Sequence, residues 1–517
     1  MNVPYKNPQL PQCVIPQSHN SVNPSFRDMS SLIHITDGII ANPLFRMATP
    51  VNFCLKVGEQ LAIIGANASG KSRFIDILTG RHRLIGDAIH YDFGEQSHRL
   101  LCENIRHIAF RDMYGDASAD NVCYQQRWNH GDQDEEIKTV REALGATDGK
   151  EGDAASDSML ETLLPLMDEP VITLSSGELR RLQLVRALRN HPRVLILDNP
   201  FIGLDDDTRR QLSELLEMLI QQTGLTVIAV LSKTDDLPSF ITHVVEVENL
   251  NVLPKKTRHD WLSTRHSHSL PLPGHSLWEK LPQREIAPFY PPQGGEILHF
   301  NHVSIRYGRR TILNNLDWTV CEGERWALSG PNGSGKSTLL SLVCADNPQG
   351  YACDIRLFGH RRGSGESIWE IKHHIGYVSP EMHRAYRKDI PALNIVASGL
   401  FDTVGLYTHP HPEQLEVCRL WMEIFGIQHL ADRTFLSLSS GEQRLCLLAR
   451  AFVKDPELLI LDEPLHGLDD LHRAQVLQII DTFCTRPHKT LVMVTHYADE
   501  YPLCITHRLK LTKNLPQ

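Results

Sequence analysis

The sequence predicts an α/β protein in which one strand–loop–helix domain occurs twice in tandem. A glycine-rich motif, G-x-x-x-x-G-K-[ST], occurs at 330–337 and again at 65–72. Each copy follows a short apolar stretch typical of a buried strand and precedes a stretch typical of a helix. Three further short motifs recur at a fixed spacing of 264 residues. Such internal repetition indicates a duplicated architecture, and each copy also has a later apolar strand ending in aspartate.

The glycine motif of the second half predicts a phosphate-binding loop. Its glycines let the backbone curl so that N–H groups point inward, and the following helix adds a partial positive charge at its N-terminus. In this motif the lysine reaches the β- and γ-phosphates and the final hydroxyl holds Mg²⁺. An isolated match could be a glycine-rich turn, but a second copy argues against that. The expected nucleotide-binding residues are Gly330, Asn332, Gly333, Gly335, Lys336, Ser337 and Thr338.

The first half carries its own phosphate loop after the apolar strand 61–64. Its register against the second half is fixed by three pairs of matching segments, each 264 residues apart. These pairs are 174–178 with 438–442, 195–198 with 459–462, and 203–205 with 467–469. The expected nucleotide-binding residues of this loop are Gly65, Asn67, Gly70, Lys71 and Ser72.

Composition places the chain among ordinary globular proteins. Its 517 residues suffice for two to four domains, with 41% hydrophobic and 22% charged residues. The net charge of −10 gives no strong nucleic-acid signal. We find no apolar run of about 20 residues and no signal-peptide pattern. The 11 cysteines form no C-x-x-C pair, so we expect reduced thiols and a cytoplasmic location.

Four segments follow from this organisation. Residues 1–28 are rich in Pro, Asn, Gln and Ser and are expected to be a disordered N-terminal extension. Residues 29–250 form a first domain and 297–517 a second. Between them, 251–296 is rich in proline and histidine and is predicted to be a linker, because proline breaks helices and strands. The histidine spacing there fits no metal-ligand template.

The second half carries the residues that ATP hydrolysis needs beyond a phosphate loop. Asp462 ends a buried apolar strand and is expected to hold Mg²⁺, together with Ser337. Glu463 follows it as the candidate general base for an attacking water. His496 ends another apolar strand and is expected to contact the γ-phosphate. Tyr307 could stack on adenine or be an ordinary packed aromatic residue of a strand.

These motifs resemble the ATP-binding-cassette (ABC) family over nearly the whole chain. Leu-Ser-Ser-Gly-Glu at 438–442 is similar to the family's signature sequence, 467–469 to its D-loop and His496 to its switch histidine. The resemblance implies two tandem P-loop NTPase domains of ABC type, each with a RecA-like core and a helical subdomain, binding ATP and Mg²⁺. It also implies a head-to-tail sandwich, in which each ATP lies between the phosphate loop of one half and the signature of the other.

The 264-residue register predicts that the two ATP sites differ. The position of Glu463 is Asn199 in the first half, and that of His496 is Ser232. An amide cannot accept a proton as a carboxylate does. In the first half, the position equivalent to Tyr307 is Asn42, unless a gap in the alignment of the two halves places Phe45 there. The alternative is that these substitutions are tolerated drift in a redundant site.

Head-to-tail pairing then gives one active and one slow composite site. The active site combines the second-half set with the first-half signature, and the slow site combines the first-half set with the second-half signature. The expected residues of the active site are Lys336, Asp462, Glu463 and His496, with Ser175 and Gly177 from the other half. Those of the slow site are Lys71, Ser72 and Asp198, with Ser439 and Gly441 from the other half. Ser72 and Asp198 are the expected metal ligands of the slow site.

One departure from the family pattern affects both halves. The glutamine expected after the strand 375–378 is replaced by Ser-Pro-Glu at 379–381, and the first-half strand 105–110 runs into Arg-Asp. In the family this loop senses Mg²⁺ and couples to a membrane partner, so its departure weakens the expectation of such coupling.

Three function classes compete. Segments 348–351 and 357–366 are similar to tandem-cassette proteins associated by name with molybdenum transport, which implies a separate membrane-spanning permease subunit as partner and a peripheral place on the inner membrane. No residue can be assigned to molybdate. A soluble regulatory or repair-type ATPase is the alternative, and a ribosome-associated translation factor is disfavoured by the proline-broken linker. The two halves could pair within one chain or between two chains as a homodimer.

Overall fold

The computed structural model describes most of both halves of the chain. The expectations for residues 1–28, for Arg111 and Asp112, for Ser175 and for His496 lie outside the described residues. The described residues are 31–94, 97–110, 138–144, 163–169, 171, 174, 176–201, 204, 206–232, 237–264, 275–282, 295–307, 310–386, 388–495, 497 and 500–512.

The first half combines a small antiparallel sheet, in the order β2-β1-β4, with a larger sheet in the order β10-β8-β3-β7-β6-β5, with β9 paired to β8. Its strands are β1 Ser31–Gly38, β2 Val51–Lys56, β3 Leu61–Ile64, β4 Ile89–Tyr91, β5 Ile105–Ala109, β6 Val194–Asp198, β7 Thr226–Leu231, β8 His243–Glu248, β9 Asn251–Val252 and β10 Lys256–Thr257. Its helices are α1 Lys71–Leu78, α2 Leu101–Asn104, α3 Val140–Leu144, α5 Ser176–Leu188, α6 Asp206–Thr223 and α7 Arg258–Ser263.

The second half repeats this plan with an antiparallel sheet, β12-β11-β14-β15, and a parallel sheet, β16-β17-β18-β13-β19. Its strands are β11 Glu296–Tyr307, β12 Arg310–Cys321, β13 Arg325–Ser329, β14 Asp354–Leu357, β15 His360–Arg361, β16 Ile375–Val378, β17 Leu458–Asp462, β18 Thr490–Val494 and β19 His507–Lys510. Its helices are α8 His275–Glu279, α9 Lys336–Val343, α10 Ile368–His373, α11 Pro380–Ala385, α12 Ala392–Ala397, α13 Pro412–Ile424, α14 Ser440–Phe452 and α15 Asp470–Cys484.

The two core sheets have the same strand order. In the first half, β8, β3, β7, β6 and β5 lie side by side, and β19, β13, β18, β17 and β16 follow the same order in the second half. Strands such as β17 and β7 are buried along their whole length. Continuous apolar runs of this kind are typical of parallel strands that are covered on both faces. The predicted α/β fold class with two tandem cassettes is confirmed.

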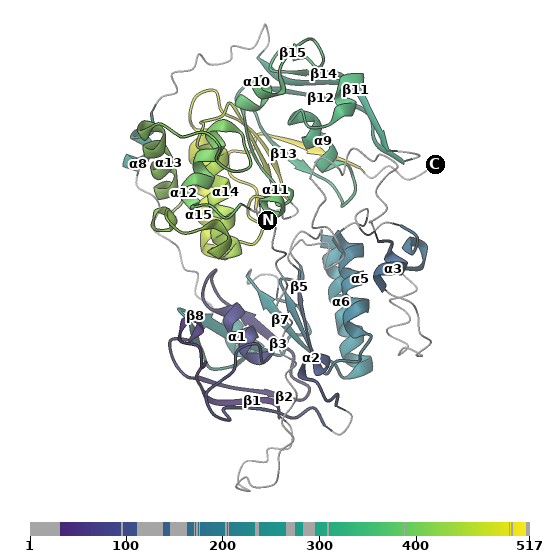
Figure 1. Cartoon of the computed structure of the whole chain (residues 1–517). Coiled ribbons are helices and arrows are strands. Elements are labelled where there is room, and N and C mark those ends of the chain that lie inside the picture. The colour runs from purple at the N-terminus through teal and green to yellow at the C-terminus, as the bar shows by residue number, and fades with distance from the viewer. Residues whose placement is uncertain are drawn as a thin grey trace, which may run out of the picture.

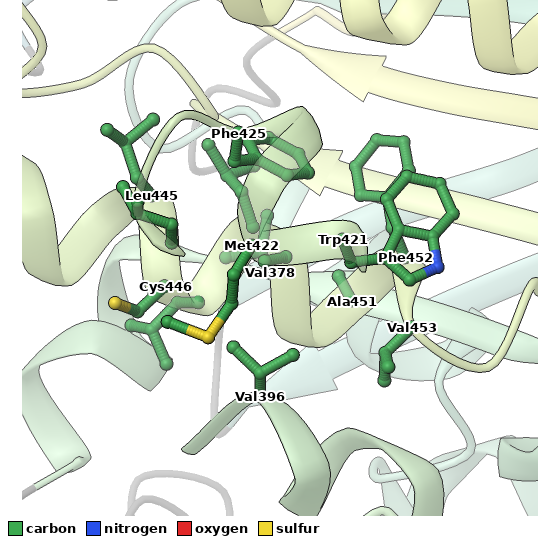
Figure 2. Packing of buried hydrophobic residues seen from close by; sticks show 14 of the residues in the cluster. Val378, Val396, Trp421, Met422, Phe425, Leu445, Cys446, Ala451, Phe452 and Val453 are labelled. Atoms are coloured by element: carbon green, nitrogen blue, oxygen red, sulfur yellow. The ribbon is translucent and has the colours of Figure 1, made fainter. Parts of the chain in front are cut away.

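A cluster of large apolar side chains joins helices α12, α13 and α14 to the core of the second half. Trp421 on α13 is 1% exposed, and its ring centroid lies 5.4 Å from that of Phe452 on α14. Figure 2 shows these rings packed with Val378, which ends β16, and with Val396 of α12. The helical layer is therefore fixed to the sheet by apolar packing.

The proline-rich segment 251–296 has regular structure in its described parts. Strands β9 and β10 pair with β8, and α7 places Trp261, 3% exposed, in the apolar core of the first half. Further on, Trp278 of α8 packs edge-on against Trp421, with ring centroids 5.6 Å apart. The expectation of an unstructured linker overlooked these two tryptophans, whose large apolar area favours burial.

Figure 1 shows the two halves facing each other in opposite orientation. Helix α1, which follows the first phosphate loop, lies on the side of the view where α14 and α15 of the second half lie. Helix α9, which follows the second loop, lies on the side of α5 and α6. Within the described part of the chain, none of the helices has the length and hydropathy required to cross a membrane.

Replacing Trp421 with alanine is expected to lower the free energy of unfolding by about 3–5 kcal/mol, because it leaves a large cavity between α13 and α14. Trp369 on α10 is 61% exposed, and its replacement should change stability by no more than about 0.5 kcal/mol. Urea unfolding followed by circular dichroism measures both variants. Equal effects would contradict the assigned packing.

Candidate active sites

The second phosphate loop joins β13 to α9. Gly335 adopts φ +94° immediately before α9, and Gly330 adopts φ +149° where a Cβ would lie 2.6 Å from the carbonyl oxygen of Leu511. Only glycine accommodates these positions. The Nζ of Lys336 donates to the carbonyl oxygens of Gly330 and Pro331, at 2.7 and 3.0 Å. The loop thus curls around its own lysine at the N-terminus of a helix, which is the geometry of a phosphate site.

The first phosphate loop has the same geometry between β3 and α1. The Nζ of Lys71 donates to the carbonyl oxygens of Gly65 and Ala66, at 2.5 and 2.7 Å. Burial lowers the pKa of Lys71 to about 8, against the opposing effects of Asp198 and Asp469. Asp198 belongs to the same half, whereas Asp469 belongs to the other. The first loop therefore already experiences a charge from the second half.

Asp462 and Glu463 stand at the carboxyl end of β17, as the sequence predicts. Glu463 adopts the left-handed conformation, with φ +47°, and its N–H donates to the carbonyl oxygen of Val494 on β18 at 2.9 Å. Its side chain is 19% exposed, and Oε2 lies 3.5 Å from Nδ1 of His466. The backbone thus turns away from the direction of β17 at Glu463, which has a partly accessible carboxylate next to the buried Asp462.

A buried arginine holds this turn. Arg444 on α14 is 1% exposed and donates to the carbonyl oxygens of Ser379, Asp462 and Pro464 at 3.1, 3.0 and 3.2 Å, and also to that of Glu463. The planar guanidinium offers five donors in a fixed fork, which suits four convergent carbonyl groups. The signature helix therefore fixes the backbone that carries the candidate general base.

Asp462 lies among other carboxylates. Burial raises the pKa of Asp462 well above its usual range, and the charges of Glu381 and Glu463 act in the same direction, while Arg444 and Lys336 oppose them. Glu381 belongs to α11, two residues after the position where the family glutamine was expected. The sequence pattern indicates only the missing glutamine. The parallel pairing of β16 with β17 places the ends of both strands, and the residues that follow them, at the same edge of the sheet.

The first half uses the same backbone turn with different side chains. Asn199 adopts φ +52°, and its N–H donates to the carbonyl oxygen of Val230 at 2.8 Å. Its Oδ1 accepts hydrogen bonds from the backbone N–H and the hydroxyl of Ser232, at 3.1 and 3.0 Å. Its Nδ2 donates to Oδ1 of Asp198 at 2.9 Å. The two residues that replace the general base and the switch histidine are therefore hydrogen-bonded to each other.

The first phosphate loop contacts the signature and D-loop of the second half. The N–H of Asn67 donates to Oδ2 of Asp469 at 2.7 Å, and its Nδ2 donates to the carbonyl oxygen of Gly467 at 3.0 Å. A Cβ on Gly441 would lie 1.9 Å from that Nδ2, so the absence of a side chain at Gly441 permits the approach. The two hydrogen bonds join residues 400 or more positions apart within one chain.

The signature serine already has a structural role. Ser439 is the N-cap of α14. Its hydroxyl accepts a hydrogen bond from the N–H of Glu442, and the carboxylate of Glu442 accepts one from the N–H of Ser439. This capping box stabilises the start of the helix and directs its N-terminus toward the other half. In the first half, Gly177 lies in α5 against Thr208 of α6.

The remaining candidates differ in how accessible they are. Ser72 and Ser337 are exposed in the first turns of α1 and α9, so their hydroxyls are accessible to a cation. Tyr307 is partly exposed at the end of β11, and its hydroxyl accepts a hydrogen bond from Asn347 at 2.9 Å. Thr338 is buried in α9.

Both loops fit a nucleotide with Mg²⁺. The Oγ atoms of Ser69 and Ser334 are buried inside the two loops and have no hydrogen-bond partner among the residues that the structure describes. Across the described residues, no group of three or more His, Cys, Asp or Glu side chains is arranged to hold a metal by itself. Mg²⁺ is typically bound by one or two protein groups together with substrate phosphates, and Ser337 and Asp462 are the candidates for such a pair.

The family assignment follows from comparison with known proteins. The sequence profile of a family described as "ABC transporter" matches the chain twice, at residues 48–202 and 313–466. Each match spans a phosphate loop, a signature helix and the aspartate at the end of β6 or β17. The chain belongs to the ABC transporter family. The two matches correspond to the two cassettes of the fold.

Two similar proteins share the tandem arrangement. The ABC transporter ATP-binding protein ModF of Escherichia coli is 38% identical over 468 residues, covering 88% of this chain and 92% of that protein. An uncharacterized ABC transporter ATP-binding protein of Schizosaccharomyces pombe is 30% identical over 495 residues, covering 93% and 98% of the two chains. The similarity to ModF confirms the relationship that the segments 348–351 and 357–366 indicate.

Solved structures support the fold alone. The archaeal ribosome recycling factor aABCE1, solved in complex with the ribosomal stalk protein aP1, aligns with a TM-score of 0.53 at 18% identity, covering 92% of this chain and 87% of the other. An RNase-L inhibitor aligns with a TM-score of 0.52, also at 18% identity.

Arg444 is expected to be a positioning residue for Glu463. Replacing it with lysine should lower kcat for ATP by about tenfold to a hundredfold with little change in KM, because an ammonium group cannot bond four carbonyl groups at once. Steady-state ATPase assays measure this change. Arg433, half-exposed and paired with Glu442, gives the matched lysine control, and equal activities of the two variants would refute the role.

Proposed function

We propose that this protein is a tandem ABC ATPase that hydrolyses Mg·ATP at one composite site and turns it over slowly at the other. The two domains are residues 29–250 and 297–517, and the active set is Lys336, Ser337, Asp462, Glu463 and His496 with Ser175 and Gly177 of the first half. The slow set is Lys71, Ser72 and Asp198 with Ser439 and Gly441. Tyr307 stacks on the adenine of the active site.

The observation that carries this proposal is the hydrogen-bond network of Asn199, Ser232 and Asp198. The amide oxygen of Asn199 accepts two bonds from Ser232, and its amide nitrogen donates to the carboxylate that would hold Mg²⁺. A network in which both substituted residues are paired argues against independent drift at the two positions. It leaves a site that can bind phosphate at Lys71 but offers no general base.

At the active site, each protein group has a distinct role. The phosphate loop and Lys336 bind and orient the phosphates, and Glu463 accepts a proton from the attacking water. Mg²⁺, when bound, neutralises charge that develops on the phosphates. Arg444 keeps the carbonyl groups around Glu463 in place, so that the carboxylate and the phosphate loop retain their relative positions.

The pairing of the halves is proposed to be intramolecular. The bonds from Asn67 to Gly467 and Asp469 lie within one chain, and they favour this arrangement over a homodimer. A close approach to Gly441 at the same edge is consistent with the signature facing the first phosphate loop.

The name of the relative ModF supports association with a transport system. We propose that a separate membrane-spanning permease subunit binds this protein on the cytoplasmic face of a membrane, with molybdate as the candidate substrate class of the whole system. The alternative is a soluble regulatory ATPase, and Ser379 favours it: this residue caps α11 and begins a segment that lacks the family's coupling glutamine.

Replacing Glu463 with glutamine should abolish nearly all ATP turnover, by about 10²–10⁴-fold, because the amide cannot accept the proton from water. The rate of phosphate release measures this loss. If the variant kept a substantial part of the ATP turnover, the asymmetry of the two sites would be contradicted. Glu423, exposed on α13, provides a glutamine control that should keep full activity.

The Glu463→Gln protein should hold ATP with the halves closed, and it can therefore be used to capture the partner. Purified from cells solubilised in mild detergent, it is expected to recover a polytopic membrane protein. Recovery of ribosomes or DNA instead would overturn the transport proposal. Recovery of neither, with ATPase activity intact in the unmutated protein, would favour the soluble regulatory ATPase.

A further inference from the structure

A tyrosine ring of the second half is contacted by one arginine from each half. The guanidinium carbon of Arg209 on α6 lies 4.1 Å from the ring centroid of Tyr497, and that of Arg473 on α15 lies 5.6 Å from it. Tyr497 directly follows His496 in the sequence. Cations within about 6 Å of an aromatic centroid are attracted by the ring, and more strongly where water is excluded.

The two arginines occupy equivalent positions in the repeat. They are 264 residues apart, which is the spacing of the other repeated motifs, and each lies near the start of the helix that follows a D-loop. The position equivalent to Tyr497 in the first half is Lys233, and a lysine attracts no arginine. The sequence therefore allows this stack at one composite site only, the one that contains Glu463.

The segment around Tyr497 is held within its own half by a buried polar group. The hydroxyl of Thr495 donates to Glu500, which also pairs with Arg473, and the N–H of Tyr497 donates to the Thr495 hydroxyl at 3.2 Å. Thr495 and Glu500 are 3% and 5% exposed. The segment begins after Val494, whose carbonyl oxygen accepts the N–H of Glu463, so its position is linked directly to the candidate general base.

Arg209 connects this segment to the first half. Besides contacting Tyr497, its guanidinium donates to the carbonyl oxygen of Leu204 at 3.3 Å, in the D-loop segment of the first half. Arg473 would keep its contacts if the halves moved apart, because it belongs to the same half as the ring. Of these two ring contacts, the one from Arg209 depends on the distance between the halves.

We propose that Arg209 is a positioning residue that acts across the interface. Its contact with the Tyr497 ring holds the segment that follows β18 in place, and hydrolysis at Glu463 depends on this contact. This inference rests on the proposed active site of the second half. When the halves are closed, Tyr497 is contacted by arginines of both halves. If the halves moved apart, it would keep only the contacts within its own half, with Arg473 and Thr495.

Replacing Arg209 with alanine is expected to lower kcat by about tenfold, the factor that corresponds to about 1.4 kcal/mol, with little change in the KM for ATP. The substitution changes no residue of either phosphate loop. The matched control is Arg210→Ala, since Arg210 is exposed on the same helix and pairs only with Asp207 and Glu214 among the contacts found for its side chain. This control should keep full activity.

The ring is tested separately. Tyr497→Phe keeps the aromatic face and should retain activity, whereas Tyr497→Leu removes the ring contacts of both arginines and should lower kcat at least as much as Arg209→Ala. The double variant Arg209→Ala with Tyr497→Leu should be no slower than Tyr497→Leu alone, because that single variant already lacks the Arg209 contact. Additive losses, or a loss in Tyr497→Phe equal to that in Tyr497→Leu, would overturn the inference.

The outcomes separate this inference from the proposed function. If the unmutated protein hydrolyses ATP in a Glu463-dependent manner while Arg209→Ala and Arg210→Ala are equally active, only the role of Arg209 is refuted. If the unmutated protein shows no hydrolysis that depends on Glu463, the proposed active site itself is refuted. Circular dichroism melting of each variant identifies any loss caused by misfolding, which Tyr497→Phe should not show.

Discussion

The structure depends on the parallel alignment of strands whose carboxyl ends meet at one edge of each core sheet. In the second half, β13 leads into the phosphate loop, β16 into the segment of Glu381, and β17 into Asp462 and Glu463. The register of these pairs sets the distances between groups that are far apart in sequence. The N-terminus of α9 therefore lies at the same edge as Asp462 and Glu463, the proposed cation ligand and general base.

The repeat keeps the backbone of this edge and changes its side chains. Glu463 and Asn199 both adopt the left-handed conformation and both donate to the strand alongside. Non-glycine residues rarely adopt this conformation, and asparagine tolerates it better than most. The same turn thus presents an accessible carboxylate in one half and an amide bonded to Ser232 and Asp198 in the other. The divergence of the two sites is chemical rather than architectural.

The two edges between the halves are also different. At one edge, Asn67 bonds backbone and side-chain acceptors of the second-half D-loop. At the other, Arg209 stacks on Tyr497 beside the segment of the switch histidine. The first edge thus joins the halves through direct hydrogen bonds. The second joins them through a ring contact at Tyr497, three residues after Val494, whose carbonyl oxygen accepts the N–H of Glu463. The proposed single hydrolytic site would need such a link only at the edge where hydrolysis occurs.

The sequence by itself determined the α/β fold class, the duplication, both phosphate loops and the positions of Asn199 and Ser232, because these rest on local motifs and on comparison of one half with the other. Its expectation for 251–296 missed the buried Trp261, since proline content describes local backbone preference and not packing. Only the tertiary structure decided that the charge of Glu381 acts on Asp462, that Arg444 bonds four carbonyl groups and that Asn199 pairs with Ser232. Side-chain contacts between distant segments depend on strand register and burial, which no local pattern encodes. Arg444 did leave a signal, since arginine also occupies the equivalent position 180 and is buried there.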